Sequence, residues 1–306
     1  MIKIREFISK YSEVLAQNDI HNPQNEVEIL ISFFLKIERG DLFLNIDNTI
    51  NDTDYTILKR AISERLTRKP LQYIIGNVPF LNTTINVNEN VLIPRSETEF
   101  MVEKVIKEFG HVEPELTILD LCTGSGAIAI SLKKNIQSAT VYGSDISELA
   151  LETAKESALL NKVEVNFIHA DLFQIVDSQF SNHFVHSSAI NRSDELSCNP
   201  QSAFRIGFDL IISNPPYVAE DIYSSLQPEL LHEPMIAVVA GNSGLYFYEK
   251  IISQSRDFLN PNGVIYLEIG ENQAKEILAL AKKYEFLKID LYKDLCEKDR
   301  IVRLQK

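Results

Sequence analysis

Tryptophan is absent from the 306 residues, and cysteine occurs only as Cys122, Cys198 and Cys296. An odd number of widely spaced cysteines without a Cys-x-x-Cys pair argues against a disulfide framework and against a zinc site. Long apolar runs are missing too, since the stretch IAVVA at 236–240 is far too short to span a bilayer. The first residues alternate charged and apolar positions, unlike a signal peptide. We therefore expect free thiols and a cytoplasmic protein without membrane contact.

Positive charge is also scarce, because 30 Lys and Arg face 43 Asp and Glu for a net charge of −13. The deficit lies almost entirely after residue 75, where 20 basic and 32 acidic side chains give −12. Such a surface repels a phosphate backbone, so no direct nucleic-acid binding is expected.

One basic cluster is the exception, and it consists of Lys59, Arg60, Arg65, Arg68 and Lys69. The favoured interpretation is a solvated helix face that Glu64 partly balances. A docking surface for a larger protein substrate is the alternative.

The front of the chain carries helical patterns. Apolar residues recur at three- and four-residue spacing in the segments 3–17, 24–37 and 53–67. Each segment predicts an amphipathic helix, so we expect a helical domain over residues 1–75. Short alternating stretches on either side of Asn82 then predict a hairpin-like linker over residues 76–95.

From residue 96 to 306 the sequence alternates strand and helix patterns. The strand candidates are 116–121, 140–145, 163–171, 208–213 and 263–270, with two more near 286–292 and 300–305. This alternation predicts an α/β domain with a Rossmann-like sheet, seven strands and helices on both faces. Ligands on such sheets bind beyond the carboxyl ends of the strands.

The stretch 174–206 interrupts this alternation. It is rich in Ser, Asn and His and is interpreted as a flexible surface insertion. Its His183 and His186 are two histidines without an evident further ligand set, so they make a poor metal site and no metal is expected.

A glycine turn, DLCTGSGAIA, runs from Asp120 to Ala129, leaving the first strand of this domain and opening a helix. Gly124 and Gly126 would let the backbone approach a ligand closely, and free N–H groups at a helix start favour an anionic group. Asp145 ends the second strand 21 residues after Gly124, so the pattern also satisfies a dinucleotide fingerprint.

Two acids favour S-adenosylmethionine over a dinucleotide. Asp120 precedes the glycines, where an acid suits a ligand with an ammonium next to its carboxylate. Asp171 ends the third strand beside Leu172, in position for an adenine, and Asp145 would accept hydrogen bonds from ribose hydroxyls. Each acid is also compatible with a plain helix cap.

The tetrapeptide Asn214-Pro215-Pro216-Tyr217 follows the strand 208–213. Its two prolines fix φ and remove two donors, so the loop presents acceptors in a stiff arrangement. An amide nitrogen is a poor nucleophile because its lone pair is delocalised. Asn214 Oδ1 and the Pro215 carbonyl would accept both of its N–H bonds and hold it facing a methyl group. We predict methylation of a planar nitrogen by positioning and by matched acceptors; a plain Pro-Pro turn is the alternative.

With these motifs, the chain resembles the HemK/PrmC glutamine-N5 methyltransferases that modify class I peptide-chain release factors. The similar segments occur in the family's order: PLQYIIGNVPF (70–80), VLIPRSETE (91–99), LDLCTGSGAIAI (119–130), ISNPPY (212–217), LHEPMIAVVAGNSGLYFY (231–248), NPNGVIYLEIGENQ (260–273) and DRIVRL (299–304). The resemblance covers nearly the whole chain.

This resemblance implies a class I methyltransferase sheet and S-adenosyl-L-methionine as cofactor, and it includes the helical front domain. The helices and the basic cluster at 59–69 suggest that this domain docks the release factor. The methylated residue would be the glutamine of the Gly-Gly-Gln motif. The implied cofactor contacts are Cys122, Thr123, Gly124, Ser125, Gly126, Asp145, Asp171 and Leu172. The implied substrate contacts run from Asn214 to Tyr217, with Asn214 near both ligands, and Pro94, Arg95 and 97–99 border the site. Cys122 stands where relatives commonly have glycine.

Three other functions are compatible with parts of the pattern. An amino-methyltransferase acting on adenine or cytosine would need a basic groove, which the charge of −12 disfavours. A second alternative keeps the glutamine chemistry and changes the target to a ribosomal protein. A non-catalytic cofactor-binding module is the third, although such a module has no need of the acceptors in the tetrapeptide.

Overall fold

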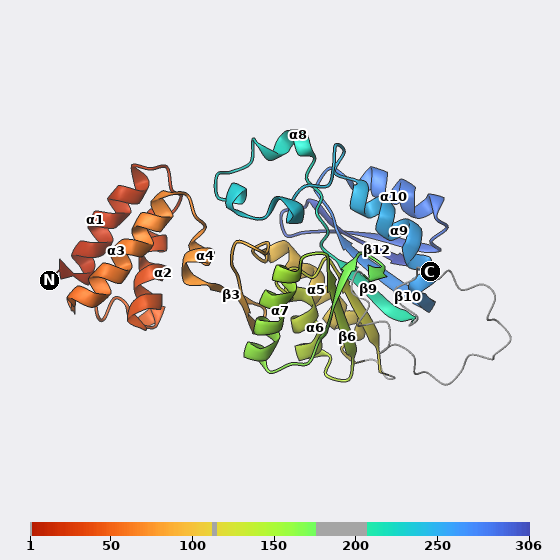
Figure 1. The fold of residues 1–306 in the computed structure, drawn as a ribbon, viewed down its shortest axis with the longest axis horizontal. Helices are drawn as coiled ribbons and strands as arrows, with labels where there is room; N and C mark the ends of the chain where they lie inside the picture. Colours follow the sequence, from red (N-terminus) through yellow and green to blue (C-terminus); the bar gives the residue numbers. More distant parts are fainter. Residues whose placement is uncertain (1, 112–114, 176–206) are drawn as a thin grey trace. The chain divides into compact units, whose positions relative to one another are not determined.

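The computed structural model describes residues 2–111, 115–175 and 207–306 (Figure 1). The chain forms two compact units, one of Met1–Asn77 with Gln227–His232 and one of Val78–Leu226 with Glu233–Lys306. Residues 176–206, which include His183, His186 and Cys198, lie outside the described residues, and the predicted insertion falls mostly there. In the described ranges, no helix has the length and apolar character that crossing a membrane requires.

The first unit is helical, as predicted. Its main elements are α1 (Ile4–Ala16), α2 (Pro23–Leu35), α3 (Asp52–Leu66) and α4 (Leu71–Ile75), with the short pair β1 (Ile2–Lys3) and β2 (Thr49–Ile50). The apolar faces of these helices meet in one core that includes Phe7, Leu15, Leu30 and Leu58. The helical spacing of the apolar residues therefore identified the three longer helices correctly.

Arg65 of α3 lies inside this unit. Its side chain is only 4% exposed, its Nε donates to Glu26 Oε2 at 2.6 Å, and its Nη2 donates to Glu229 Oε1 at 2.9 Å. The prediction of a solvated helix face was therefore wrong for Arg65. A guanidinium can be buried when carboxylates pair with it, and the second of these carboxylates comes from a segment far away in the sequence.

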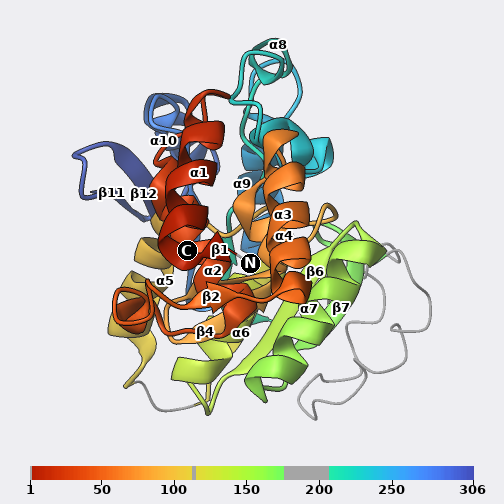
Figure 2. The same cartoon turned by 90° about the vertical axis from the view of Figure 1, so that its left-hand side faces the viewer.

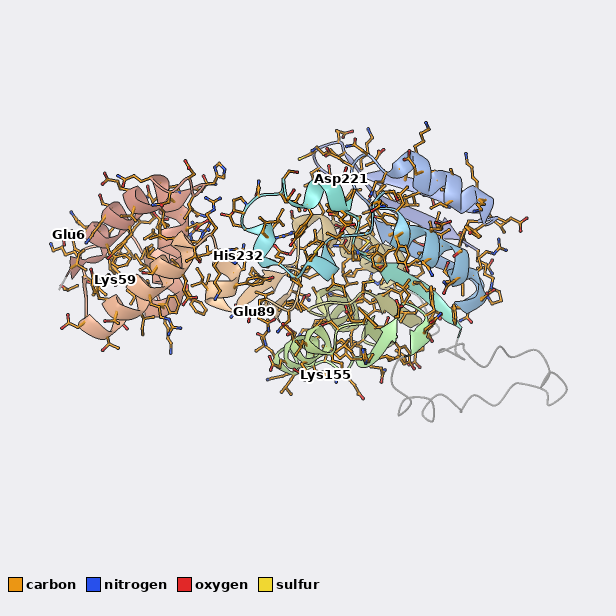
Figure 3. All side chains as sticks on the ribbon, turned by 45° about the horizontal axis from the view of Figure 1, so that its top comes forward. Glu6, Lys59, Glu89, Lys155, Asp221 and His232 are labelled. Carbon is orange, nitrogen blue, oxygen red and sulfur yellow. The ribbon has the colours of Figure 1, made fainter. Side chains whose placement is uncertain are left out.

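The other members of the basic cluster are less buried. Arg68 also pairs with Glu229, whereas Arg60 and Lys69 both pair with Glu64. Lys59, labelled in Figure 3, is exposed. The positive charge of this helix face is thus largely balanced within the unit.

The second unit is built on one twisted sheet with the strand order β11-β12-β10-β9-β5-β6-β7-β8. The strands are β5 (Thr117–Leu121), β6 (Thr140–Asp145), β7 (Asn166–Asp171), β8 (Gln174–Ile175), β9 (Phe208–Ser213), β10 (Leu259–Glu268), β11 (Lys288–Lys293) and β12 (Asp299–Gln305). From β7 to β10 the neighbours are parallel, while β12 is antiparallel to both of its neighbours. Seven of these strands are the predicted ones, and the short β8 adds to the edge.

Helices cover both faces of the sheet (Figures 1 and 2). One group comprises α5 (Ser96–Phe109), α6 (Ala127–Asn135) and α7 (Glu148–Asn161), and the other comprises α9 (Tyr246–Phe258) and α10 (Ala274–Lys283). Strand residues such as Leu119, Ile211 and Leu267 pack with Tyr248 and Ile277 in a fully buried core. This core fixes where the strands end, and therefore where the loops that carry the motifs begin.

The predicted hairpin is formed by β3 (Asn77–Phe80) and β4 (Thr83–Asn86). It is held to α7 by side chains of that helix. The Thr84 N–H donates to Asn161 Oδ1 at 3.1 Å, and the Asn86 N–H donates to Ser157 Oγ at 3.0 Å. From Val78 onward the hairpin is thus part of the second unit, and it leads the chain into the segment 90–95.

Candidate functional site

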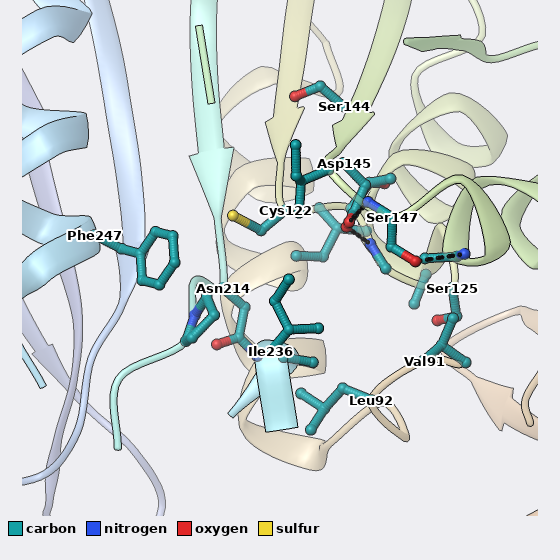
Figure 4. Close-up of a pocket in the computed structure, with 18 of the residues that line it drawn as sticks. Val91, Leu92, Cys122, Ser125, Ser144, Asp145, Ser147, Asn214, Ile236 and Phe247 are labelled. Carbon is teal, nitrogen blue, oxygen red and sulfur yellow. Dashed lines mark hydrogen bonds between the residues drawn. The ribbon is translucent and has the colours of Figure 1, made fainter. Parts of the chain in front are cut away.

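A cavity of about 310 Å³ lies at the carboxyl ends of β5, β6, β7 and β9 (Figure 4). Its volume is at the lower end of the range for small-molecule sites, roughly 300–1,000 Å³. The predicted site residues that line it are Cys122, Thr123, Gly124, Ser125, Asp145, Asp171, Leu172, Asn214 and Pro216. Four other predicted residues, Asp120, Gly126, Pro215 and Tyr217, are not among the lining residues. The sheet therefore brings the glycine turn, two strand-end acids and the Asn-Pro-Pro-Tyr loop to one place.

Asp120 is fully buried beneath the glycine turn. Its Oδ2 accepts hydrogen bonds from Thr123 Oγ1 at 2.6 Å and from the Ala129 N–H at 3.2 Å, so it braces both sides of the turn. Its Oδ1 has no partner among the described residues, and burial raises the pKa of Asp120 to about 7. A direct contact between Asp120 and a ligand's ammonium stays a prediction.

Backbone conformation explains three residues of the turn. Gly126 has φ +81°, which disfavours any side chain, and a Cβ there would lie 3.1 Å from Ala154 Cβ, so glycine suits the start of α6. Gly124 has φ +54° with open space where a Cβ would be. Cys122 has φ +59°, a region that favours glycine, which accounts physically for the glycine expected there in relatives.

Asp145, at the end of β6, is hydrogen-bonded to the glycine turn. Its Oδ2 accepts from the Gly124 N–H and its Oδ1 accepts from the Ser147 N–H, both at 2.9 Å. Figure 4 shows Asp145 and Ser147 together at one side of the cavity. The Gly124 N–H, which the glycine pattern predicted to face an anionic ligand, is therefore occupied by Asp145. The carboxylate, with about four lone-pair sites in all, retains acceptor capacity for a ligand.

Asn214 lies at the opposite side of the cavity, near Ile236 and Phe247 in Figure 4. Its Nδ2 donates to Thr98 Oγ1 at 3.1 Å. Its Oδ1 is buried and accepts no hydrogen bond from any described residue. A buried carbonyl without a donor costs about 1–3 kcal/mol, which an N–H of a ligand would offset; that role of Asn214 stays a prediction.

The Asn-Pro-Pro-Tyr loop is fixed where it leaves the site. Gln273 Nε2 donates to the Tyr217 carbonyl at 3.0 Å, and the Gly270 N–H donates to Gln273 Oε1 at 3.0 Å. Burial raises the pKa of the Tyr217 hydroxyl to about 12, so this group is protonated at neutral pH. Tyr217 is thus a fixed neighbour of the site and not a base.

Three polar residues that support the site without lining the cavity had no predicted role. Glu233 accepts the Ile93 N–H at 3.1 Å and pairs with Arg95, so it ties the segment before α5 to the loop after Tyr217. Glu268 ends β10, and Gln273 follows this strand. All three residues lie in segments that the family resemblance includes. For Glu268 the sequence offered a signal, an acid at the end of the otherwise apolar strand VIYLE.

Gly244 offers a test of how rigid this loop must be. A Cβ at Gly244 would lie 2.5 Å from the Tyr217 carbonyl oxygen, and its φ of +71° disfavours any side chain. We expect Gly244→Ala to lower turnover and to cost about 2 kcal/mol of stability, beyond the ~1 kcal/mol of the left-handed backbone alone. Gly241→Ala is the matched control, because Gly241 has φ +67° but its nearest contact would be at 3.9 Å. Equal effects of both variants in thermal unfolding and turnover would contradict this expectation.

Comparison with known proteins agrees with this geometry. Residues 6–76 match the family model described as the PrmC N-terminal domain, and residues 118–197 match one described as a methyltransferase domain. The release factor glutamine methyltransferase of Thermodesulfovibrio yellowstonii is 36% identical over 99% of this chain and 97% of its own length. The enzyme of the same name from Fusobacterium nucleatum is 34% identical over 98% of this chain and 78% of its own length.

Solved structures support the fold. A methyltransferase from Pyrococcus furiosus is similar with a TM-score of 0.50 and 14% identity, over 84% of this chain and 99% of its own. This likeness concerns the sheet and its helices alone. The sequence relatives reach further, since they align over nearly the full length at more than 30% identity. The chain belongs to the family of the release factor glutamine methyltransferases.

Proposed function

We propose that this chain transfers a methyl group from S-adenosylmethionine to the side-chain amide nitrogen of a release-factor glutamine, the one in the Gly-Gly-Gln motif. Family membership supports the reaction class and the release factor as substrate. The observation that carries the role of the site is the unpaired Oδ1 of Asn214 at the cavity, because an NH₂ group is the donor that it lacks. An ionised carboxylate, which has acceptors and no donor, would leave it unsatisfied.

The residues of the cavity fit S-adenosylmethionine. Asp145 has carboxylate lone pairs for the ribose hydroxyls, and Asp171 with Leu172 lines the part of the cavity where the adenine is expected. The open space at Gly124 leaves room for a ligand against the backbone. When bound, S-adenosylmethionine supplies an electrophilic methyl group on a sulfonium.

The chain's own contribution is to hold the nucleophile. Asn214 Oδ1 accepts one N–H of the substrate amide, and the Pro215 carbonyl is the expected acceptor for the other. These acceptors turn the nitrogen lone pair towards the methyl group and match the positive charge that develops on the nitrogen. The amide N–H becomes strongly acidic once the nitrogen is methylated, so the site needs no strong base. This assignment agrees with the protonated state of Tyr217.

Replacing Asp145 tests the cofactor side of the site. We expect Asp145→Ala to weaken S-adenosylmethionine binding by about 1.5–3 kcal/mol, the usual scale of hydrogen bonds to a charged group. The variant also frees the N–H groups of Gly124 and Ser147, so thermal unfolding must show that it is folded. Titration calorimetry on the folded variant measures the affinity, and an unchanged value would overturn the assignment.

The function is tested with labelled S-adenosylmethionine and a purified class I release factor, followed by mass mapping of the modified peptide. We expect one methyl group on the motif glutamine, and none when that glutamine is replaced by Asn or Glu. Labelling of the altered factor at the natural rate, or of DNA or a ribosomal protein in preference to the factor, would refute the proposal.

A further inference from the structure

Asn214 is the first residue of a buried hydrogen-bonded chain with two further members. Thr98 Oγ1, on the first turn of α5, accepts from Asn214 Nδ2 at 3.1 Å and donates to Glu268 Oε2 at 2.6 Å. Thr98 is 4% exposed and Glu268, at the end of β10, is 1% exposed. Three elements thus converge on the residue that receives the substrate.

The hydroxyl of Thr98 has a single hydrogen, and this decides the direction of the hydrogen bonds from Asn214 to Glu268. Because Glu268 takes that hydrogen, Thr98 has only lone pairs left for Asn214. Asn214 must then turn its NH₂ group towards Thr98. Its carbonyl is the group that remains for the cavity, as the unpaired Oδ1 shows.

We propose that Thr98 and Glu268 are positioning residues that fix the orientation of the Asn214 amide and so make the site select an amide over a carboxylate. An asparagine turned by 180° would present NH₂ to the cavity, where it would attract the carboxylate of glutamate and repel the NH₂ of glutamine. Glutamine and glutamate side chains have nearly the same shape, so volume alone separates them poorly. The inference rests on the proposed glutamine substrate and adds the source of its selectivity.

Thr98→Val tests the chain at its centre, because valine keeps the shape and removes the hydroxyl. We expect kcat to fall about tenfold while the KM for S-adenosylmethionine stays unchanged, as for the loss of one hydrogen bond. Thr98→Ser keeps the hydroxyl and should stay within about threefold of the wild type. Glu268→Leu should reproduce Thr98→Val, and Glu268→Gln, which retains an acceptor, should resemble the wild type.

Selectivity is the readout that a purely structural role would not change. Selectivity is measured with a release factor in which Glu replaces the motif glutamine. This altered factor competes with the natural factor, and its inhibition constant is determined from the rate at which the natural factor is methylated. We expect this competitor to bind about tenfold more tightly to Thr98→Val than to the wild type. An unchanged inhibition constant in Thr98→Val, or an equal loss of kcat in Thr98→Val and Thr98→Ser, would overturn the positioning role of Thr98 and Glu268. A wild-type protein that methylates no release factor would instead refute the proposed function.

Discussion

Replacing Asn214 with Ala is expected to lower turnover on the release factor about 100–1,000-fold, by comparison with other preorganised polar groups. The variant loses the acceptor that holds the amide nitrogen, and it leaves Thr98 Oγ1 without its donor. Affinity for S-adenosylmethionine should change little, because Asp145 and the glycine turn lie at the other side of the cavity. Single-turnover kinetics with saturating cofactor measure the effect on the chemical step.

A control variant should separate this effect from general damage. Asn82→Ala removes an exposed asparagine whose amide pairs with Asn135 and with no other described residue, and its turnover should equal that of the wild type. Asn214→Asp keeps an acceptor but adds a negative charge beside the buried Glu268, so we expect it to bind cofactor and remain slow. If Asn214→Ala retained more than about a third of wild-type turnover, the orienting role of this residue would be wrong.

Arg65→Ala should cause the largest loss of stability, about 3–5 kcal/mol, because it leaves carboxylates without their buried partner. Glu26 and Glu229 would then face each other with Arg68 as the remaining cation. Arg60→Ala is the matched control on the same helix, since the Arg60 side chain is 83% exposed and its pair with Glu64 should contribute less than about 0.5 kcal/mol.

Urea unfolding followed by circular dichroism measures both variants. A difference of less than about 1 kcal/mol between Arg65→Ala and Arg60→Ala would mean that the buried arginine contributes no more than an exposed one. The expected loss concerns the first unit, so S-adenosylmethionine binding to the folded second unit should persist in both proteins. The docking role of the first unit stays a prediction.

Patterns with a short period were predictable from the sequence. The helices of the first unit and the strands 140–145 and 208–213 follow directly from apolar spacing. The cavity was predictable for a second reason, since parallel strands bring their carboxyl ends to one edge and the motifs follow those ends. Asp145 and Asn214 could therefore be placed at the same site without a structure.

Pairings between distant residues were not predictable in this way. The contacts of Arg65 with Glu229 and of Thr98 with Glu268 join residues more than 150 positions apart. Nothing in the local spacing says which acid will meet which donor, because that depends on how the elements pack. The sequence also could not show that Asp120 braces the turn from below, since an acid before the glycines is compatible with either role.

The segment Gln227–His232 gives the first unit a property that matters while the protein is being made. Arg65 and Glu229 are 164 positions apart, so the ribosome finishes the helices of the front long before it adds their last partner. At about 5–20 residues per second, this interval lasts roughly 10–30 s. During that time Glu26 is the one carboxylate already made among the partners that Arg65 has in the described residues. The first unit therefore lacks the segment with Glu229 while its helices are already made. This segment is added only when most of the second unit has also been synthesised.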